Sequence, residues 1–336
     1  MRRMRVMALA VVGAALVGLP GTLLTSAQAP AGGAAKKAGP GPWVTPKTLW
    51  GHPDLQGVWD STTGTPLERP ADLAGKEFLT AEEAEAREKT RFAQFDSADR
   101  GAGNPTGDYG SVWREGSKNA LNRTALVIDP KDGKLPPLTA QGQQAASTRR
   151  QARQKRGAAD SWEDRSLWER CLTRGTPRIP NNYNSNWHIL QTEDSVVIHQ
   201  EMIHENRVIP LDGRPHLSDA LRQWNGDPRG RWEGETLVVE TTNFNETQEF
   251  RGFPLKNARL VERFRRTDAD TLDYTFTIDD LTTYTAPFTV SLPMTRNGEG
   301  YYEYACHEGN YGLLNILAGE RVMEKTAKPR RPATPR

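Results

Sequence analysis

The 336-residue sequence has only two cysteines, no large excess of charge of either sign, and a single long apolar run, at its start. Two cysteines in a chain of this length exclude a disulfide-dense scaffold. With 44 Lys and Arg against 42 Asp and Glu, the chain has no global field that would attract nucleic acid. The common serine-nucleophile, phosphate-loop and His-Glu-x-x-His motifs are absent, which argues against a conventional serine hydrolase, NTPase or zinc protease.

The first 29 residues have the three regions of a secretory signal peptide. A basic start precedes an apolar run over 6–19, which is too short to span a bilayer comfortably. Small residues favour cleavage after Ala29, with Ala27 as the alternative because Pro30 would follow the first cut. We therefore predict a periplasmic or extracellular protein that has no integral membrane segment once residues 1–29 are removed.

Composition divides the part of the chain that follows. Residues 30–48, rich in Pro, Gly, Ala and Lys, are predicted to be a linker, and 325–336 a disordered basic tail. Residues 49–180 are predicted to be irregular and partly helical.

Local signals place a few elements within this irregular part. Thr80 and Thr139 have the features of helix N-caps, and a short strand is predicted over 124–128. The basic run at 149–156, in the helix that follows Thr139, is interpreted as a solvated helical face.

Residues 181–324 change to the period-two pattern of β-strands and end in a helix that starts at Asn310. Strands are predicted over 195–203 and 301–306, and a hairpin over 259–279. Consecutive strands without helical crossovers favour an antiparallel meander that closes on itself. The predicted fold class is therefore mainly β: an antiparallel lipocalin-like barrel or half-barrel with an irregular, partly helical N-terminal wrap and a C-terminal helix.

The two cysteines are Cys171 and Cys306. In an oxidising compartment two cysteines pair more often than they stay free, so we predict a disulfide between them. The alternative is a reactive thiol at Cys306 beside His307, which would form a nucleophile–base pair.

Several motifs occur together along residues 50–320. They are PDLQGVW at 53–59, DRSLWERC at 164–171, EMIH at 201–204, LDGRPH at 211–216, WEGETLVVET at 232–241 and CHEGNYG at 306–312. In this combination the chain resembles a widespread family of secreted proteins from environmental bacteria. The resemblance implies export and a lipocalin-like β fold, and it transfers no catalytic residue.

Glu262 is the first candidate for chemistry, because it lies between Leu260 and Phe264 on the apolar face of its predicted strand. A carboxylate there must be paired, hydrogen-bonded or protonated, since the burial of a lone charge is too costly. Such a group suits a general acid or base. The alternative is a structural salt bridge to an arginine that reaches into the barrel.

His199 and Glu201 are two residues apart on a predicted strand and would project from one face. With a third ligand from His307, Glu303 or His188, this pair has the residue types of a metal site. Our main expectation is a protein without an organic cofactor and without a metal.

Two polar loops are further candidates for ligand binding. His307, Glu308 and Asn310 lie at a strand-to-helix corner and either bind a ligand or only build the corner.

The second loop holds Asp212, Arg214 and His216, which are predicted to bind an anionic or polar ligand. The alternative is a plain turn, because Asp-Gly is a strong turn signal.

We expect an exported protein that performs hydrolase-, lyase- or isomerase-type acid–base chemistry on a small neutral or weakly polar molecule in the barrel interior. Glu262 or Glu201 is the expected base, and His204 or His307 the acid or orienting partner. The first alternative is a non-catalytic carrier or sensor of the cell envelope with the same cavity, and the second is a structural envelope protein without one.

Overall fold

The computed structural model of this protein describes residues 43–99, 122–180 and 184–326. The predicted signal peptide, most of the predicted linker and most of the predicted basic tail lie outside the described residues.

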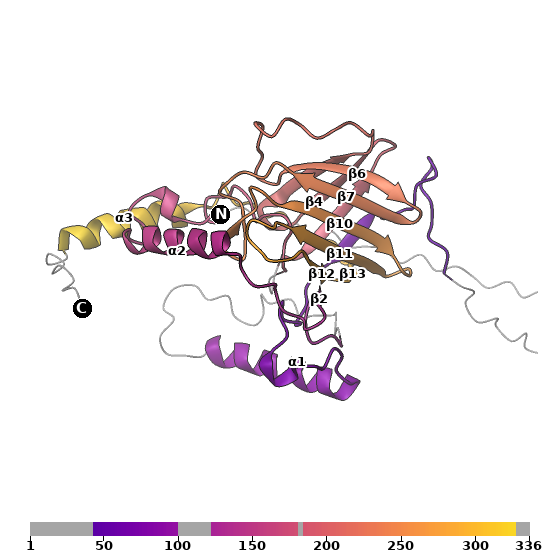
Figure 1. The fold of residues 1–336 in the computed structure, drawn as a ribbon, viewed down its shortest axis with the longest axis horizontal. Helices are drawn as coiled ribbons and strands as arrows, with labels where there is room; N and C mark the ends of the chain where they lie inside the picture. Colours follow the sequence, from indigo (N-terminus) through magenta and orange to yellow (C-terminus); the bar gives the residue numbers. More distant parts are fainter. Residues whose placement is uncertain (1–42, 100–121, 181–183, 327–336) are drawn as a thin grey trace, which may run out of the picture. The chain divides into compact units, whose positions relative to one another are not determined.

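Eleven strands of the described residues form one antiparallel sheet, in the order β5-β4-β3-β1-β13-β11-β10-β7-β6, while β12 pairs with β11 and β2 (Figure 1). These strands are β1 (Gly57–Asp60), β2 (Val127–Asp129), β3 (Asn186–Gln191), β4 (Ser195–Gln200), β5 (Glu205–Pro210), β6 (Asp227–Glu233), β7 (Thr236–Thr242), β10 (Arg259–Arg266), β11 (Thr271–Asp279), β12 (Phe288–Ser291) and β13 (Met294–Arg296). A separate hairpin joins β8 (Glu249–Phe250) to β9 (Phe253–Pro254).

The sheet curls into a nearly closed barrel, because its two edge strands, β5 and β6, approach each other. Gly230 on β6 makes the approach possible. A Cβ added there would lie 2.6 Å from Leu211 Cδ2 and 2.8 Å from Ile209 Cγ2. The predicted fold class, a mainly β protein with an antiparallel barrel and a C-terminal helix, is confirmed.

Alternate residues of each strand fill the barrel interior, as the period of two predicts. In the hairpin of β10 and β11 every second residue is buried, and Glu262 pairs with Phe276 in the strand register. The largest of the fully buried side chains are aromatic and come from both halves of the chain: Trp59, Trp187, Tyr274, Phe244, Phe264, Phe276 and Phe288.

The N-terminal half contributes more to the sheet than the sequence predicts. The strand predicted over 124–128 is present as β2, one to three residues further along. The unpredicted β1 lies between β3 and β13, with Trp59 fully buried. Four residues are too short for a periodic signal, so only pairing with distant strands defines β1.

Two predicted strands are wrong in detail. The strand predicted over 195–203 ends at Gln200, after which Glu201 is helical and Ile203 and His204 have positive φ angles. His199 and Glu201 therefore do not project from one strand face. Residues 301–306 form no strand and run as an irregular segment to the last helix.

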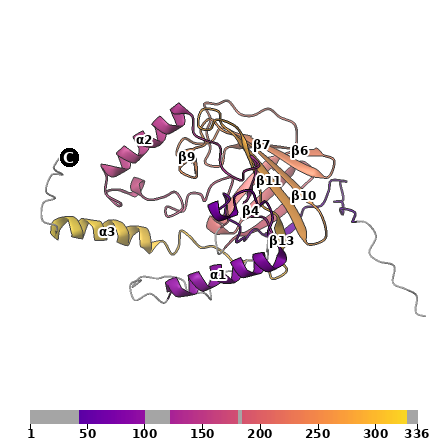
Figure 2. The ribbon, with the colours of Figure 1, turned by 60° about the horizontal axis from the view of Figure 1, so that its bottom comes forward.

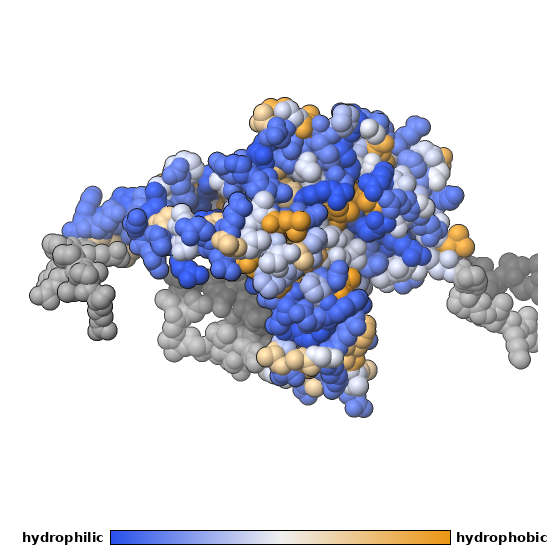
Figure 3. All heavy atoms as spheres, viewed as in Figure 1, coloured by the Kyte–Doolittle hydropathy of each residue, from blue (hydrophilic) through white to orange (hydrophobic). Residues whose placement is uncertain are grey.

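Three α-helices accompany the sheet in the described residues, α1 (Ala81–Asp99), α2 (Ala140–Gln154) and α3 (Tyr311–Thr326) (Figure 2). The predicted caps at Thr80 and Thr139 are confirmed, because each side chain accepts a backbone N–H of the first turn. None of the helices in these ranges is long and apolar enough to cross a bilayer. The face of the molecule in Figure 3 is mainly hydrophilic, with hydrophobic residues in small separate patches.

Candidate functional site

The buried carboxylate of Glu262 lies inside the barrel in a complete set of polar contacts. Arg207 Nη1 donates to its Oε1 over 2.9 Å, and Arg207 Nη2 donates to its Oε2. Tyr274 OH donates to Oε1 over 2.9 Å, and Arg207 Nη2 also reaches Thr241 Oγ1 at 2.6 Å. The arginine that the sequence left open as a partner of Glu262 is thus Arg207, on β5.

This network stabilises charge where water has no access. Arg207 and Glu262 have side chains 3% and 0% exposed, and a bidentate pair is the geometry that best compensates two buried charges. Burial, and secondarily the Glu262 charge, raises the pKa of Tyr274 well above its usual range, so Tyr274 keeps the proton that it donates.

Outside the barrel, four of the six histidines form two pairs, His188 with His199 and His204 with His307. We call His188, His199, His204 and His307, with Tyr301, the histidine cluster. His188 and His199 are directly opposite each other in the register of β3 and β4. Tyr301 covers both, with ring centroids 5.6 Å from His188 and 5.4 Å from His199.

Hydrogen bonds orient this pair of imidazoles. His188 Nδ1 lies 3.2 Å from Tyr301 OH, and His199 Nδ1 lies 2.8 Å from Asn206 Oδ1. Burial and the nearby His199 lower the pKa of His188. Burial, and secondarily Glu201, raises the pKa of Tyr301. Both effects favour neutral side chains.

The second half of the cluster depends on a tight turn after β4. Ile203 and His204 have φ angles of 67° and 44°, a region that a β-branched residue rarely adopts. Such strain costs on the order of 1–3 kcal/mol and persists only where the surroundings hold it. The turn directs His204 toward His307, with ring centroids 5.9 Å apart.

The backbone carbonyl of Tyr304 determines the tautomer of neutral His204. Its oxygen lies 2.7 Å from His204 Nδ1, and a carbonyl only accepts hydrogen bonds. Nδ1 therefore carries the proton, and the lone pair of a neutral imidazole is on Nε2. His204 is half-buried and His307 is exposed, so this Nε2 belongs to a site with access to solvent.

Glu201 joins the segments that build the cluster. Its carboxylate is 2% exposed and accepts from Asn186 Nδ2 at 2.8 Å, from the Asn186 backbone at 3.3 Å and from the Tyr302 backbone at 3.3 Å. It thus ties the start of β3 and the segment at 301–307 to the turn. The structure brings His204 and His307 together, connects Glu201 to their segment only through the Tyr302 backbone, and places Glu262 inside the barrel.

The predicted disulfide between Cys171 and Cys306 is present, with Cα atoms 5.8 Å apart. It fixes the segment that carries His307. Asn310 caps α3, because its Oδ1 accepts from Leu313 N at 3.2 Å while its Nδ2 donates to Glu169 O at 2.9 Å. Glu308 is exposed. Asn310 therefore helps to build the corner before α3, which is one of the two roles that the sequence left open.

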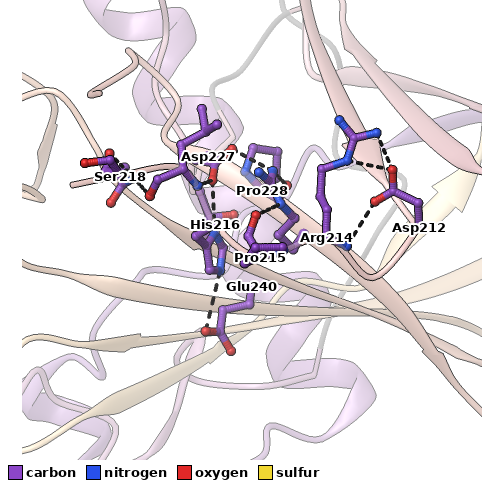
Figure 4. A network of polar contacts seen from close by, with 12 residues as sticks. Asp212, Arg214, Pro215, His216, Ser218, Asp227, Pro228 and Glu240 are labelled. Atoms are coloured by element: carbon purple, nitrogen blue, oxygen red, sulfur yellow. Dashed lines mark hydrogen bonds and ion pairs between the residues drawn. The ribbon is translucent and has the colours of Figure 1, made fainter. Parts of the chain in front are cut away.

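The loop that carries Asp212, Arg214 and His216 does not bring these three residues to one point (Figure 4). Arg214 turns to Asp212, with Nε donating to Oδ2 over 2.6 Å. His216 points instead between Asp227 and Glu240, with contacts of 3.2 and 3.7 Å. These contacts attach the loop to β6 and β7.

The residues named as possible metal ligands, His199, Glu201 and His307, lie in the same region but have different partners. Within the described ranges, three ligand atoms lie within 4.8 Å of one another at Asp160, Glu320 and Glu324. Acidic surface groups of this kind are common without an ion. A metal at His199, Glu201 and His307 stays the untested alternative to the predicted absence of a metal.

Sequence reasoning missed Arg207 and Tyr301, the side chains that complete the two polar regions. Arg207 has a usable signal, since it alternates with the inward-facing Ile209 on β5. Tyr301 has none, because it lies on an irregular segment. Comparison of the chain with protein-family models, with curated proteins and with solved structures finds no match.

Proposed function

We propose that this protein is exported and uses the histidine cluster to bind a small neutral or weakly polar molecule and perform acid–base chemistry on it. The signal-peptide pattern and the disulfide support export to an oxidising compartment. Membership of the secreted bacterial family, implied by the sequence motifs, belongs to the same proposal. The reaction site lies outside the barrel and not in its interior.

The single observation that carries this proposal is the contact of His204 Nδ1 with the Tyr304 carbonyl. It leaves Nε2 of the neutral imidazole free to take a proton from a bound molecule. His307 gives a proton to the oxygen or nitrogen that gains negative charge. In an isomerase-type step the substrate loses one proton to His204 and gains one from His307 at another atom; in a lyase-type step the proton from His307 goes to the leaving group. In a hydrolase-type step the proton taken by His204 comes from the attacking water, and the proton from His307 goes to the group released when the bond breaks.

Glu201 acts in this proposal as a positioning residue, because its oxygens are bonded to Asn186 and to the Tyr302 backbone. Glu262 has no part in the reaction, since Arg207 and Tyr274 occupy its oxygens. The sequence alone named Glu262 first and Glu201 second as the expected base. In this proposal Glu201 contributes to the site and Glu262 does not.

The test is a mass-spectrometric comparison of a mixture of small neutral metabolites before and after incubation with the mature protein. We expect a compound that is consumed by the wild type and by His216→Gln, the matched control, but not by His204→Gln. Equal consumption by His204→Gln would contradict the role of His204. A compound that is bound but never consumed would favour the carrier.

The His188–His199 pair supports a second candidate function, the binding of a divalent transition-metal ion. A neighbour that accepts from Nδ1 orients a metal-binding histidine, and Asn206 Oδ1 does so for His199. The test is a calorimetric titration with Zn²⁺. Binding by the wild type that is lost in His188→Gln, with His216→Gln unchanged, supports this function.

A further inference from the structure

A pocket of about 380 Å³ lies between α2 and the hairpin of β8 and β9, away from the histidine cluster. Its lining combines three arginines of α2 with an apolar wall: Arg149, Arg150 and Arg153, with Ala146, Gly252 and Phe253. We call this cavity the arginine pocket. The basic run is solvated, as the sequence predicts, since Arg150 and Arg153 are exposed, and part of it also lines this open pocket.

The helix that forms one wall is held against the barrel. Thr139, the N-cap of α2, donates to the carbonyls of Thr282 and Thr283 over 2.6 and 3.0 Å. Gly142 packs so closely on Thr283 that a Cβ there would collide with the Thr283 carbonyl oxygen. At the pocket itself, Arg149 Nη1 donates to Gly252 O over 2.8 Å. The two walls are therefore connected by direct contacts.

The apolar wall is held as well. The ring of Phe253 packs edge-on against Tyr284, with centroids 5.8 Å apart. The pocket is open to solvent, with Arg150 and Arg153 exposed at its rim, and it places polar groups beside an apolar wall, as small-molecule sites do.

The positive charges of the pocket exceed its negative charges. Glu249 forms an ion pair with Arg149 and lies 3.8 Å from Arg153. Within the described part of the chain no group pairs with the guanidinium of Arg150. Three guanidinium groups thus share one carboxylate, which leaves a net charge of two. Burial and the charge of Arg153 lower the pKa of Arg149, as expected where like charges are crowded.

We propose that the arginine pocket binds a small phosphate monoester that carries an apolar or aromatic group. The dianion matches the net charge of two, and guanidinium groups bind phosphate oxygens through paired N–H donors. Phe253 and Ala146 contact the apolar group. This site is independent of the proposed acid–base function, which concerns a neutral molecule at other residues.

The experiment is an isothermal titration of the mature protein with phenyl phosphate, with inorganic phosphate and phenol as separate probes. We expect saturable binding of phenyl phosphate, weaker binding of inorganic phosphate and none of phenol. Arg150→Gln and Arg153→Gln should each weaken phenyl phosphate binding by roughly tenfold or more, because each removes a charge-assisted hydrogen bond.

The matched control is Arg263→Gln, which removes an exposed arginine paired with Glu233 on the barrel. It should leave the affinity within about twofold, since it changes only a distant surface charge. Both pocket variants alter exposed side chains, and their circular dichroism should equal that of the wild type. No saturable binding, equal binding by all variants, or inorganic phosphate as tight as phenyl phosphate would each overturn the proposal.

Discussion

The barrel interior and the histidine cluster both hold titratable side chains, but they use them differently. Inside, Glu262 is bonded to Arg207 and Tyr274, all almost fully buried. Outside, His204 has one ring nitrogen bonded to a carbonyl and the other without a hydrogen bond to any described residue, beside the exposed His307. A buried carboxylate whose two oxygens already have partners stabilises the fold, whereas a half-bonded imidazole near solvent is available for chemistry.

This difference follows from whether a side chain lies in the barrel interior or at the surface of the molecule. A lone charge on the inner face is too costly, so evolution of a buried carboxylate requires a buried partner. On the outer face water solvates an unpaired group at little cost. Burial of a titratable residue is therefore a weaker sign of function in this protein than an incomplete set of hydrogen bonds.

The substitution with the largest expected effect on the contrast between the two regions is Glu262→Gln, which leaves Arg207 buried without a countercharge. We expect a loss of about 3–5 kcal/mol in the free energy of unfolding, measured by urea denaturation. The double variant Glu262→Leu with Arg207→Leu should recover part of that loss. A stable Glu262→Gln protein without activity would instead make Glu262 a catalytic residue.

Removal of the disulfide should affect the region of the histidine cluster. Cys171→Ser with Cys306→Ser should lower the free energy of unfolding by about 2–4 kcal/mol, because the unfolded chain gains a long open loop. Reduction of the wild type should give the same denaturation curve as the double variant. If reduction changes neither stability nor the NMR signals of His307, the crosslink does not hold the cluster.

A matched pair of substitutions compares the two regions directly. Tyr274→Phe removes a buried donor to Glu262 and should cost about 1.5–3 kcal/mol. Tyr301→Phe removes the hydroxyl that hydrogen-bonds half-buried His188 and should cost at most about 0.5 kcal/mol. Equal losses in thermal or urea denaturation would show that the two tyrosines have similar surroundings, contrary to the comparison.

The smallest expected effect is on the titration of His188, whose pKa burial and His199 lower. Below the ordinary imidazole pKa of about 6.5, the unfolded chain then binds a proton that folded His188 does not yet bind. Stability should fall as the pH falls through that value, and level off below the folded pKa.

His199→Gln should raise the pKa of His188, since it removes the nearby positive charge, and NMR titration of the imidazole protons measures this. His216→Gln, in the loop on β6 and β7, should leave the pKa of His188 unchanged. A His188 that titrates identically in all three proteins would contradict the cross-strand contact.

Local signals in the sequence predict local structure well. Thr80 and Thr139 cap helices as their neighbours indicate, and the hairpin of β10 and β11 has the predicted alternation. The same signals fail at β1, which only its pairing with β3 and β13 defines. They also fail at Ile203, whose left-handed backbone contradicts its own preference.

The candidate site shows the same limit. Glu201, His204 and His307 were predicted from their residue types and motifs; the structure brings the two histidines together, and Glu201 contacts the backbone of the segment that carries His307. Their division into a positioning carboxylate and a free imidazole depends on Asn186, Tyr302 and Tyr304. Two of these contacts use backbone atoms, which no residue type reveals.

By itself, the amino-acid sequence determines the mainly β fold class and the helix caps, because both depend on patterns among neighbouring residues. It also determines the pairing of the cysteines, because each of the two has only one possible partner. Only the tertiary structure decides that Glu262 meets Arg207 inside the barrel, while outside it His188 meets His199 and His204 meets His307. The physical reason is that the closure of the sheet, a long-range event, assigns each titratable group to a dry interior or to a wet surface.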